Sequence, residues 1–434
     1  MKKIAILVFF TVGFFVHVWA CTGLIAGKQA TVDGSVLVTY SADSHTLYGA
    51  LTSSPAADWP KGSMRSIVEW DTNKPLGEIE QVEHTYAVIG NMNEHQLTVV
   101  ESTWGGRPEL VDTTGIIDYG SLMQLALERA KTAREAIKVM TGLVKKYGYY
   151  SSGESFTIAD PNEAWILDLI GKGPGRRGAV WVAVRIPDDC IAGHANYPRI
   201  HKIPMDDKEN CLYSPDVISF AREMGYFDGL NKDFSFARAY SPADFGALRA
   251  CDARVWSFFR KYDSSMDNYL PYVNGESAEP FPLYVKPSRK LSVQDMKEAM
   301  RDHFEDTPFD MTQDVGAGPF KVPYRFRPMS FEVDGKSYCM ERAIATQQTG
   351  FTLVGQMRNW LPDPVGGVLW FGVDDANTCV YIPMYCGITQ VPECFSPENG
   401  SMYDFSWTSA FWIHNWVANM AYARYEPMIG DIRK

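Results

Sequence analysis

Short strand-like runs separated by turn residues recur through the first half of the chain, and this pattern limits the fold more than any other feature. Apolar or alternating runs flank four turns, at residues 32–34, 91–96, 160–163 and 187–189. In the first turn, Asp33 and Gly34 supply the positive φ that a tight connection needs. Strands joined by such short turns pair antiparallel, so the sequence predicts four hairpins.

A helical stretch separates the second hairpin from the third. Residues 121–148 place apolar side chains at helical spacing, and Thr132 with Glu135 forms a capping-box pattern, so we expect two consecutive helices there. Another aromatic helix is expected within 409–434. No repeat or linker interrupts the chain. The pattern predicts an α+β fold, with two sheets between helical layers in one domain.

The first twenty residues read as a secretory signal peptide. MKKIAILVFFTVGFFVHVWA places two lysines before an apolar run and ends in Val18 and Ala20, the small-residue spacing of a cleavage site before Cys21. We therefore expect residues 1–20 to be removed and residues 21–434 to form the mature domain. Such a protein is secreted or periplasmic, with no membrane contact after cleavage.

Charge and motif content exclude several classes of function. The formal charge of −11 opposes binding to nucleic acid, which needs a basic surface. The eight cysteines form no CxxC pair, and HExxH is absent, so neither a metal nor another cofactor is expected. In an oxidising compartment, Cys379 could pair with Cys386 or Cys394.

A mature chain that begins with cysteine carries a thiol nucleophile and a free α-amine in one residue. The amine, with a pKa of about 7.7–8.0, can take and return the thiol proton, so no histidine is needed. Such a site also needs a group that orients the amine and donors for the oxyanion. Cys21 is therefore our candidate nucleophile.

Two polar residues at expected strand ends are candidates for these tasks. Asp43 ends the strand that pairs with the strand beginning at Cys21, although Asp-Ser-His also suits an ordinary turn. Asn196 follows the fourth hairpin, where its amide could serve an oxyanion or cap a turn. Position alone leaves both alternatives open for each residue.

Long motifs in a fixed order connect the chain to a known family. They are CTGLIAGKQATVDGSVLVTYSADSH, IGNMNEHQLTVVESTWGGRPEL, GESFTIADPNEAWILDLIG, HANYPRI, ERAIATQQTGFTLVGQMR and WFGVDDANTCVYIPMY. From residue 21 to its end the chain resembles the secreted dipeptidases of the N-terminal-nucleophile (Ntn) cysteine hydrolases. The resemblance implies a four-layer αββα sandwich with inserted loops and helices. It also implies a domain cut short at its C-terminal end.

The resemblance implies that Cys21 cleaves dipeptides with its own amine as base. More distant relatives, the bile-salt hydrolases and penicillin V acylases, carry an Arg and an Asp after the cysteine. Asp43 matches that Asp, whereas Tyr40 stands in place of the Arg. A neutral tyrosine cannot hold a thiolate by charge. With no cationic partner evident in the sequence, Asp43 is expected to orient the Cys21 amine and to meet the free amino end of a dipeptide.

Three further positions follow from the same resemblance. Asn196 matches an oxyanion-hole asparagine, whereas Thr103 replaces the other expected asparagine. The oxyanion hole would then rest on Asn196 and a backbone N–H, for which the N–H of Thr103 is a candidate. Arg254 matches an arginine of the active site in the family that the chain resembles.

Two alternatives remain open at this point. An Ntn amidase acting on N-acyl amino acids or bile-salt conjugates would use the same chemistry. Alternatively, Val18 to Cys21 resembles a lipobox, and acylation of Cys21 would leave a lipid-anchored, non-catalytic protein. The expected partners are dipeptides, and the formation of a homo-oligomer is left open.

Overall fold

Two antiparallel sheets form the centre of the molecule. The computed structural model describes residues 21–325 and 330–434, so the expected leader at 1–20 lies outside the described residues. Within these ranges, the two large sheets have seven and eight strands. The seven-stranded sheet has the order β16 (Tyr284–Val285), β14 (Ile191–His194), β1 (Thr22–Ala26), β2 (Val36–Asp43), β19 (Thr349–Met357), β20 (Val368–Val373) and β21 (Ile382–Tyr385). The eight-stranded sheet has the order β15 (Cys211–Tyr213), β13 (Ala179–Ile186), β12 (Ala164–Gly171), β11 (Glu154–Ala159), β10 (Thr98–Thr103), β9 (Met92–Asn93), β8 (Val88–Ile89) and β3 (Ser53–Ser54).

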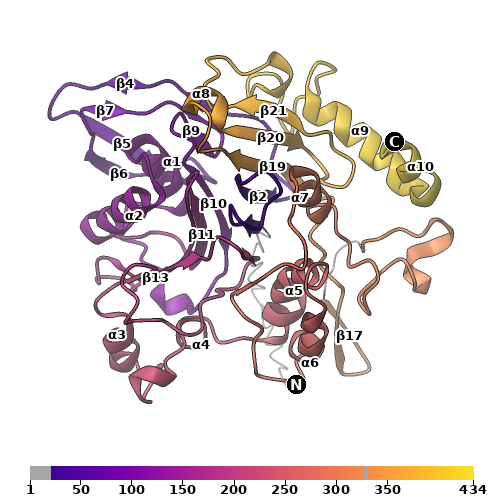
Figure 1. Cartoon of the computed structure of the whole chain (residues 1–434), viewed down its shortest axis with the longest axis horizontal. Coiled ribbons are helices and arrows are strands. Elements are labelled where there is room, and N and C mark those ends of the chain that lie inside the picture. Colours follow the sequence, from indigo (N-terminus) through magenta and orange to yellow (C-terminus); the bar gives the residue numbers. More distant parts are fainter. Residues whose placement is uncertain (1–20, 326–329) are drawn as a thin grey trace, which may run out of the picture.

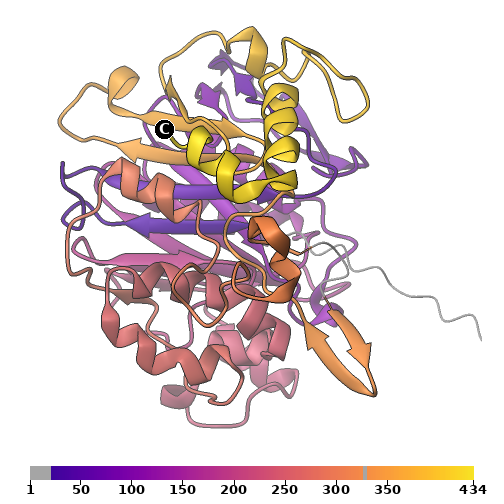
Figure 2. The same cartoon turned by 90° about the vertical axis from the view of Figure 1, so that its right-hand side faces the viewer.

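Helices cover the outer faces of both sheets (Figure 1). The helices are α1 (Tyr119–Arg129), α2 (Ala133–Tyr147), α3 (Val217–Glu223), α4 (Phe236–Tyr240), α5 (Ala253–Arg260), α6 (Leu270–Val273), α7 (Val293–Ala299), α8 (Asp363–Gly366), α9 (Ala410–Ala423) and α10 (Tyr425–Ile432). Helices α1 and α2 pack on the eight-stranded sheet, while α5 and α7 contact the seven-stranded sheet. Figure 2 shows α5, α7 and α9 in front of the seven-stranded sheet.

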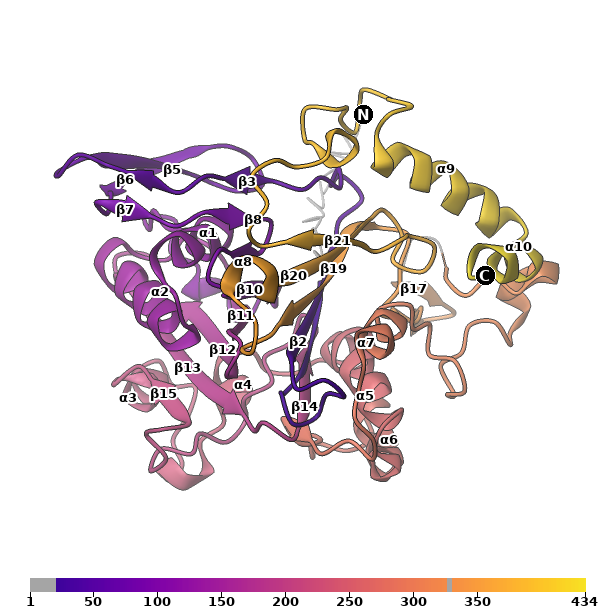
Figure 3. The ribbon, with the colours of Figure 1, turned by 45° about the horizontal axis from the view of Figure 1, so that its top comes forward.

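The alternation of side chains along the strands separates three apolar cores. In β1, Ile25 belongs to the core between the sheets, whereas Leu24 belongs to the core under α5 and α7. In β10, Val100 packs between the sheets and Val99 packs under α1 and α2. Successive strand residues point to opposite faces, so each sheet buries both of its faces. The observed fold is therefore α+β, with sheets and helices in layers (Figure 3).

The first and third expected hairpins and the helix pair are confirmed. Strand β1 pairs with β2, and β11 pairs with β12. The break between α1 and α2 falls at Thr132, whose side chain accepts the N–H of Glu135 at the start of α2. The Glu135 carboxylate accepts the N–H of Lys131 instead of completing a capping box. Local turn and cap residues determined these elements.

The second and fourth expected hairpins differ from the sequence prediction. The region of the second turn contains the extra strand β9, which lies between β8 and β10. At the fourth turn, β13 stays in the eight-stranded sheet, whereas β14 joins the seven-stranded sheet beside β1. The prediction of a fourth hairpin was therefore wrong, because the chain crosses between the sheets at 187–190. That crossing brings Asn196 beside Cys21.

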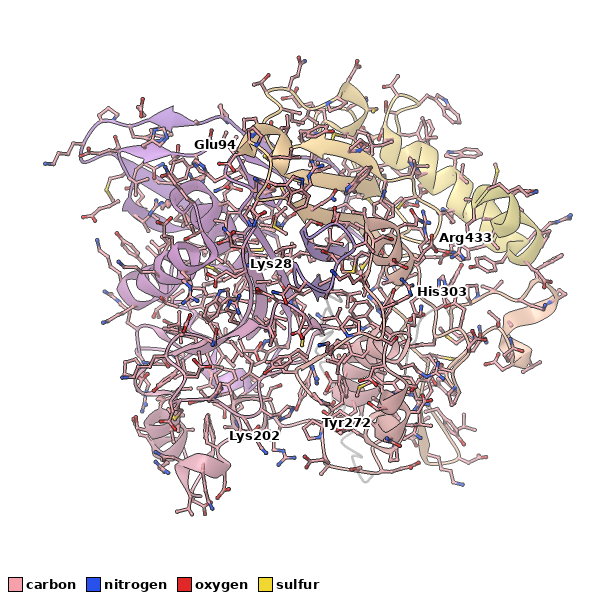
Figure 4. All side chains as sticks on the ribbon, in the orientation of Figure 1. Lys28, Glu94, Lys202, Tyr272, His303 and Arg433 are labelled. Carbon is pink, nitrogen blue, oxygen red and sulfur yellow. The ribbon has the colours of Figure 1, made fainter. Side chains whose placement is uncertain are left out.

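Lys28 connects the two sheets at the turn after β1. Its Nζ donates to the carbonyl of Asn162, in the turn between β11 and β12, at 2.9 Å, and lies 3.3 Å from Asp188. Figure 4 shows Lys28 near the centre of the view.

Small two-stranded ladders lie outside the sheets: β4 (Ala57–Asp58) with β7 (His84–Thr85), β5 (Met64–Val68) with β6 (Pro75–Glu80), and β17 (Ser330–Val333) with β18 (Lys336–Cys339).

Two further findings concern cysteines and the membrane. The thiols of Cys379, Cys386 and Cys394 are free, so the local disulfide that the sequence left possible is not present in this structure. Across 21–325 and 330–434, no helix combines the length and apolar character that a membrane span requires.

Candidate active site

A cavity of about 310 Å³ lies where β1 and β2 meet the open edge of β10. Cys21, Tyr40 and Asp43 line it from the seven-stranded sheet, Glu101 from β10 and Tyr119 from α1. The cavity fits there because β9 pairs with β10 only at Thr98, whereas β11 pairs along the whole strand. Its apolar walls include Trp70, Met123, Leu127, Phe351 and Phe371.

Cys21 is buried at the wall of this cavity, in surroundings that favour the protonated thiol. The Sγ atom lies 3.7 Å from the Tyr40 hydroxyl oxygen. Burial, followed by the charges of Glu101 and Asp43, raises the pKa of the thiol well above its ordinary value. The thiol is therefore not held as a thiolate, and any reaction through it would require a base.

Tyr40 connects the Cys21 thiol to a carboxylate. Its hydroxyl donates to Glu101 Oε1 at 2.5 Å, and its ring packs edge-on against Phe351. Burial and the neighbouring Cys21 and Glu101 raise the pKa of Tyr40 well above 10, so the side chain stays neutral. Tyr40 therefore links the Cys21 thiol to Glu101 through its hydroxyl and brings no charge of its own.

Asp43 has a cationic partner that sequence reasoning missed. Its Oδ2 accepts from Arg342 at 2.6 Å and from Ser41 at 3.1 Å, while Oδ1 accepts from Thr349 at 2.7 Å. The expectation that Asp43 lacked a cation other than an amine was wrong. Arg342 and Thr349 both lie in ERAIATQQTG, a motif that had contributed only to the family resemblance. Asp43 and Arg342 lie nearly 300 residues apart in the chain, so no local sequence pattern indicates their contact.

Asn196 and Arg254 form a rigid group behind Cys21. Arg254 is buried and donates to the Cys21 carbonyl at 2.9 Å, to Thr22 Oγ1 at 2.7 Å and to Asn196 Oδ1 at 2.8 Å. Asn196 has φ 56°, a conformation that Asn tolerates better than most residues. Because its Oδ1 faces Arg254, its amide nitrogen is directed away from the guanidinium and donates to the Thr103 carbonyl at 2.5 Å.

Thr103 lies next to the cavity but does not line it. Its hydroxyl donates to Glu154 Oε1 at 2.6 Å, and its carbonyl accepts from Asn196. It lines a second cavity of about 310 Å³, which shares Asp71 and Tyr119 with the first. Its side chain is thus engaged with a carboxyl group.

His194 is not placed to act as a base. It is buried, with Nδ1 2.6 Å from Ser102 Oγ and Nε2 2.8 Å from Thr157 Oγ1. Burial and the nearby Arg254 lower its pKa to about 3. The imidazole is neutral and held between hydroxyls. This geometry does not form a Cys-His pair with Cys21.

Three carboxyl groups that sequence reasoning missed surround the junction of the two cavities. Glu101 and Glu154 lie on the same face of the eight-stranded sheet, and Asp71 accepts a hydrogen bond from Tyr119 at 2.8 Å. Burial raises the pKa of all three groups, to about 6 for Asp71. In the described part of the chain no group of three or more metal-ligand residues is arranged to hold a metal. The only sequence signal was a glutamate inside each of two quoted strand motifs.

Comparison with known proteins identifies the family of the chain. The model of peptidase family C69 matches residues 20–434. A probable dipeptidase of Salmonella dublin is 27% identical over 396 residues, which cover 85% of this chain and 81% of the relative. A probable dipeptidase of Latilactobacillus sakei is 24% identical, with 94% and 82% covered, and dipeptidase A of Lactobacillus helveticus is 24% identical, with 93% and 82% covered. The chain therefore belongs to peptidase family C69, and it is a hydrolase of the cysteine-peptidase type.

Proposed function

We propose that the protein is a secreted cysteine dipeptidase in which Cys21 becomes the first residue after removal of residues 1–20. The observation that carries the proposal is the position of the Cys21 thiol at the wall of a cavity of about 310 Å³. The relatives' names, probable dipeptidase and dipeptidase A, support the substrate class.

The raised pKa of Cys21 suggests how the reaction starts. Once freed, the α-amine takes the thiol proton as Sγ attacks the scissile carbonyl carbon. The resulting ammonium then gives that proton to the leaving amine, and the peptide C–N bond breaks. A thioester to Cys21 remains. Water attacks its carbonyl carbon with the amine again acting as base, the C–S bond breaks, and the ammonium returns the proton to the thiolate as the first amino acid leaves. The negative charge of Asp43, fixed by Arg342, stabilises the ammonium during the cycle.

Asn196 is our candidate for an oxyanion donor. Arg254 holds both the Cys21 carbonyl and the Asn196 Oδ1, so it fixes the amide relative to the nucleophile. We assign Arg254 a positioning role, because its guanidinium is occupied by the Cys21 carbonyl, Thr22 and the Asn196 Oδ1. Thr103 also contributes indirectly, since its carbonyl orients the Asn196 amide. Tyr40 positions the thiol through the 3.7 Å contact with its sulfur.

We further propose that residues 21–434 form one four-layer αββα domain of the Ntn type. Two face-to-face sheets, with α1 and α2 outside one and α5 and α7 outside the other, support this arrangement. Cys21 immediately precedes a central strand of the seven-stranded sheet. Secretion to the periplasm or the medium supplies the leader cleavage that the mechanism requires.

Intact mass and N-terminal sequencing of protein from a secreting host test the proposal. A chain that begins at unmodified Cys21 and hydrolyses dipeptides, with Cys21→Ala inactive, supports it. A lipid on Cys21, another N-terminus, or an active Cys21→Ala variant overturns it. Glycine conjugates of fatty acids and of bile acids, assayed beside a dipeptide panel, distinguish an amidase from a dipeptidase.

A further inference from the structure

The cavity beside Cys21 contains carboxyl groups and no basic side chain among its described lining residues. Asp43 is already compensated by Arg342, and Asp71 is bound by Tyr119. Glu101 differs from both. It is 2% exposed, lines the cavity, and its Oε2 atom has no hydrogen-bond partner among the described residues.

A second buried carboxyl group lies directly behind Glu101. Glu154 is fully buried, and its Oε2 atom likewise finds no partner in the described ranges. Glu154 opposes Thr103 across the strand pair, so it is the diagonal neighbour of Glu101 on the same sheet face. Burial and the charge of Glu101 raise the pKa of Glu154, so the pair retains a proton when the site is empty.

Distances from the nucleophile indicate which ligand suits this pair. Glu101 Oε1 is 2.5 Å from the Tyr40 hydroxyl, which is 3.7 Å from Cys21 Sγ, so the carboxylate lies within about 6 Å of the sulfur. In an α-aminoacyl group the amine lies about 2.5 Å from the carbonyl carbon. With that carbon about 3–3.5 Å from Sγ, an aminoacyl group turned toward β10 can reach Glu101 with its amine at hydrogen-bond distance.

We propose that Glu101, supported by Glu154, binds the α-ammonium group of the substrate's first residue. This inference rests on the proposed function and specifies its substrate: a peptide with a free amino end, cleaved at the first peptide bond. It transfers to Glu101 the role that the sequence had suggested for Asp43, whose carboxylate is occupied by Arg342, Thr349 and Ser41.

One consequence follows from the exchange of a proton for an ammonium group. Binding of the cationic substrate releases the proton that Glu101 and Glu154 share, because the ammonium supplies the missing positive charge. A substrate without the amine does not release this proton.

Binding to the full-length secreted Cys21→Ala variant tests the inference without hydrolysis. The probes are alanyl-alanine and propionyl-alanine, which differ only in the amino group. We expect calorimetry to give at least about 10²-fold weaker binding of propionyl-alanine, since a buried carboxylate then loses its partner. In buffers of different ionisation enthalpy, alanyl-alanine should release a proton and propionyl-alanine should not.

The Glu101→Gln substitution in the same background should remove the preference for alanyl-alanine. Gln keeps the oxygen that accepts from Tyr40, so the local structure is preserved. Glu128→Gln is the matched control, because Glu128 is buried in α1 but paired with Arg65 and absent from the cavity lining. Its preference should remain.

Different outcomes separate this inference from the proposed function. Equal binding of the two probes, or a preference that survives Glu101→Gln, overturns the ammonium site while leaving the hydrolase intact. Hydrolysis by Cys21→Ala overturns the proposed mechanism instead. If Glu101→Gln binds neither probe, the melting temperature decides: a folded variant supports the site. If Glu101→Gln is misfolded, Glu154→Gln is tested in the same Cys21→Ala background instead. Its preference for alanyl-alanine over propionyl-alanine is then expected to fall. A preference equal to that of Cys21→Ala alone overturns the site.

Discussion

The two carboxylate regions beside Cys21 are built differently. On the seven-stranded sheet, Asp43 is paired with Arg342 and hydrogen-bonded by Thr349 and Ser41. On the eight-stranded sheet, Glu101 and Glu154 each keep one buried oxygen without a partner among the described residues. A compensated buried carboxylate stays charged and fixes structure, whereas an uncompensated pair takes up a proton or a cation. The first region therefore suits positioning, and the second suits ligand exchange.

The largest expected effect concerns Cys21, where the two regions meet. Cys21→Ala should lower kcat by about 10⁶-fold, the scale found when a nucleophile is removed. Because the side chain is small and the neighbouring contacts use the Cys21 carbonyl, the melting temperature should change little. Dipeptide hydrolysis and thermal unfolding measure the two quantities. Retention of more than a few per cent of activity would contradict the assignment.

The second prediction concerns removal of the ion pair between Asp43 and Arg342. Arg342→Met leaves Asp43 charged and buried without its cation, which should cost about 3–5 kcal/mol in the free energy of unfolding. Urea unfolding measures it. Asp43→Asn combined with Arg342→Met should recover much of the loss, because no isolated charge remains. Equal stability of the single and double variants would mean that the ion pair is not what fixes Asp43.

The third prediction concerns Asn196, which Arg254 holds beside Cys21. Asn196→Ala should lower kcat about 10²–10³-fold with little change in KM, as expected for a donor that acts in the transition state. Glu101→Gln should instead affect binding of the free amine. Steady-state kinetics on alanyl-alanine compares the two variants, and a pure KM effect in Asn196→Ala would reverse its assignment.

The smallest expected effect is a pH-dependent gain in the free energy of unfolding when Glu154 is replaced by Gln. The raised pKa of Glu154 means that the folded protein holds this proton more tightly than the unfolded chain does. Stability therefore falls as the pH rises from the ordinary carboxyl range through the raised pKa. Glu154→Gln cannot ionise, and Gln can still accept from Thr103. Relative to the parent, it should gain about 1–2 kcal/mol between pH 5 and pH 8.

Thermal unfolding at the two pH values checks the last prediction. Asp43→Asn supplies the contrast, because removal of a compensated charge should give no such gain as the pH rises. A constant difference between Glu154→Gln and the parent would show that the carboxyl ionises with its ordinary pKa.

Local features of the fold could be predicted from the sequence, but pairings between distant segments could not. Turn and cap residues located β1 with β2, β11 with β12, and the break at Thr132. The turn at 187–190 carried the same local signal as a hairpin, yet its strands pair with different neighbours. A short turn restricts where the chain reverses, and burial against other segments decides which strand it joins.

The same distinction applies to the candidate site. Cys21, Asp43 and Asn196 stood at strand ends or motif positions that could be named in advance, and the structure brings Asn196 to Cys21 through Arg254. Arg342 and Glu101 could not be found in this way. Arg342 pairs with a carboxylate that lies far away in the sequence, and Glu101 faces a cavity beyond the edge of its strand. Both placements depend on tertiary packing alone.

The positions of Arg254 and Arg342 have a consequence for the timing of activity. Both hold groups near the start of the chain, and both come from its later half. Asp43 is separated from its partner Arg342 by 299 positions, so the first strands are synthesised long before that contact can form. Contacts of such long sequence separation form slowly. The candidate site is therefore completed only late in folding, when the second half of the chain has packed against the first.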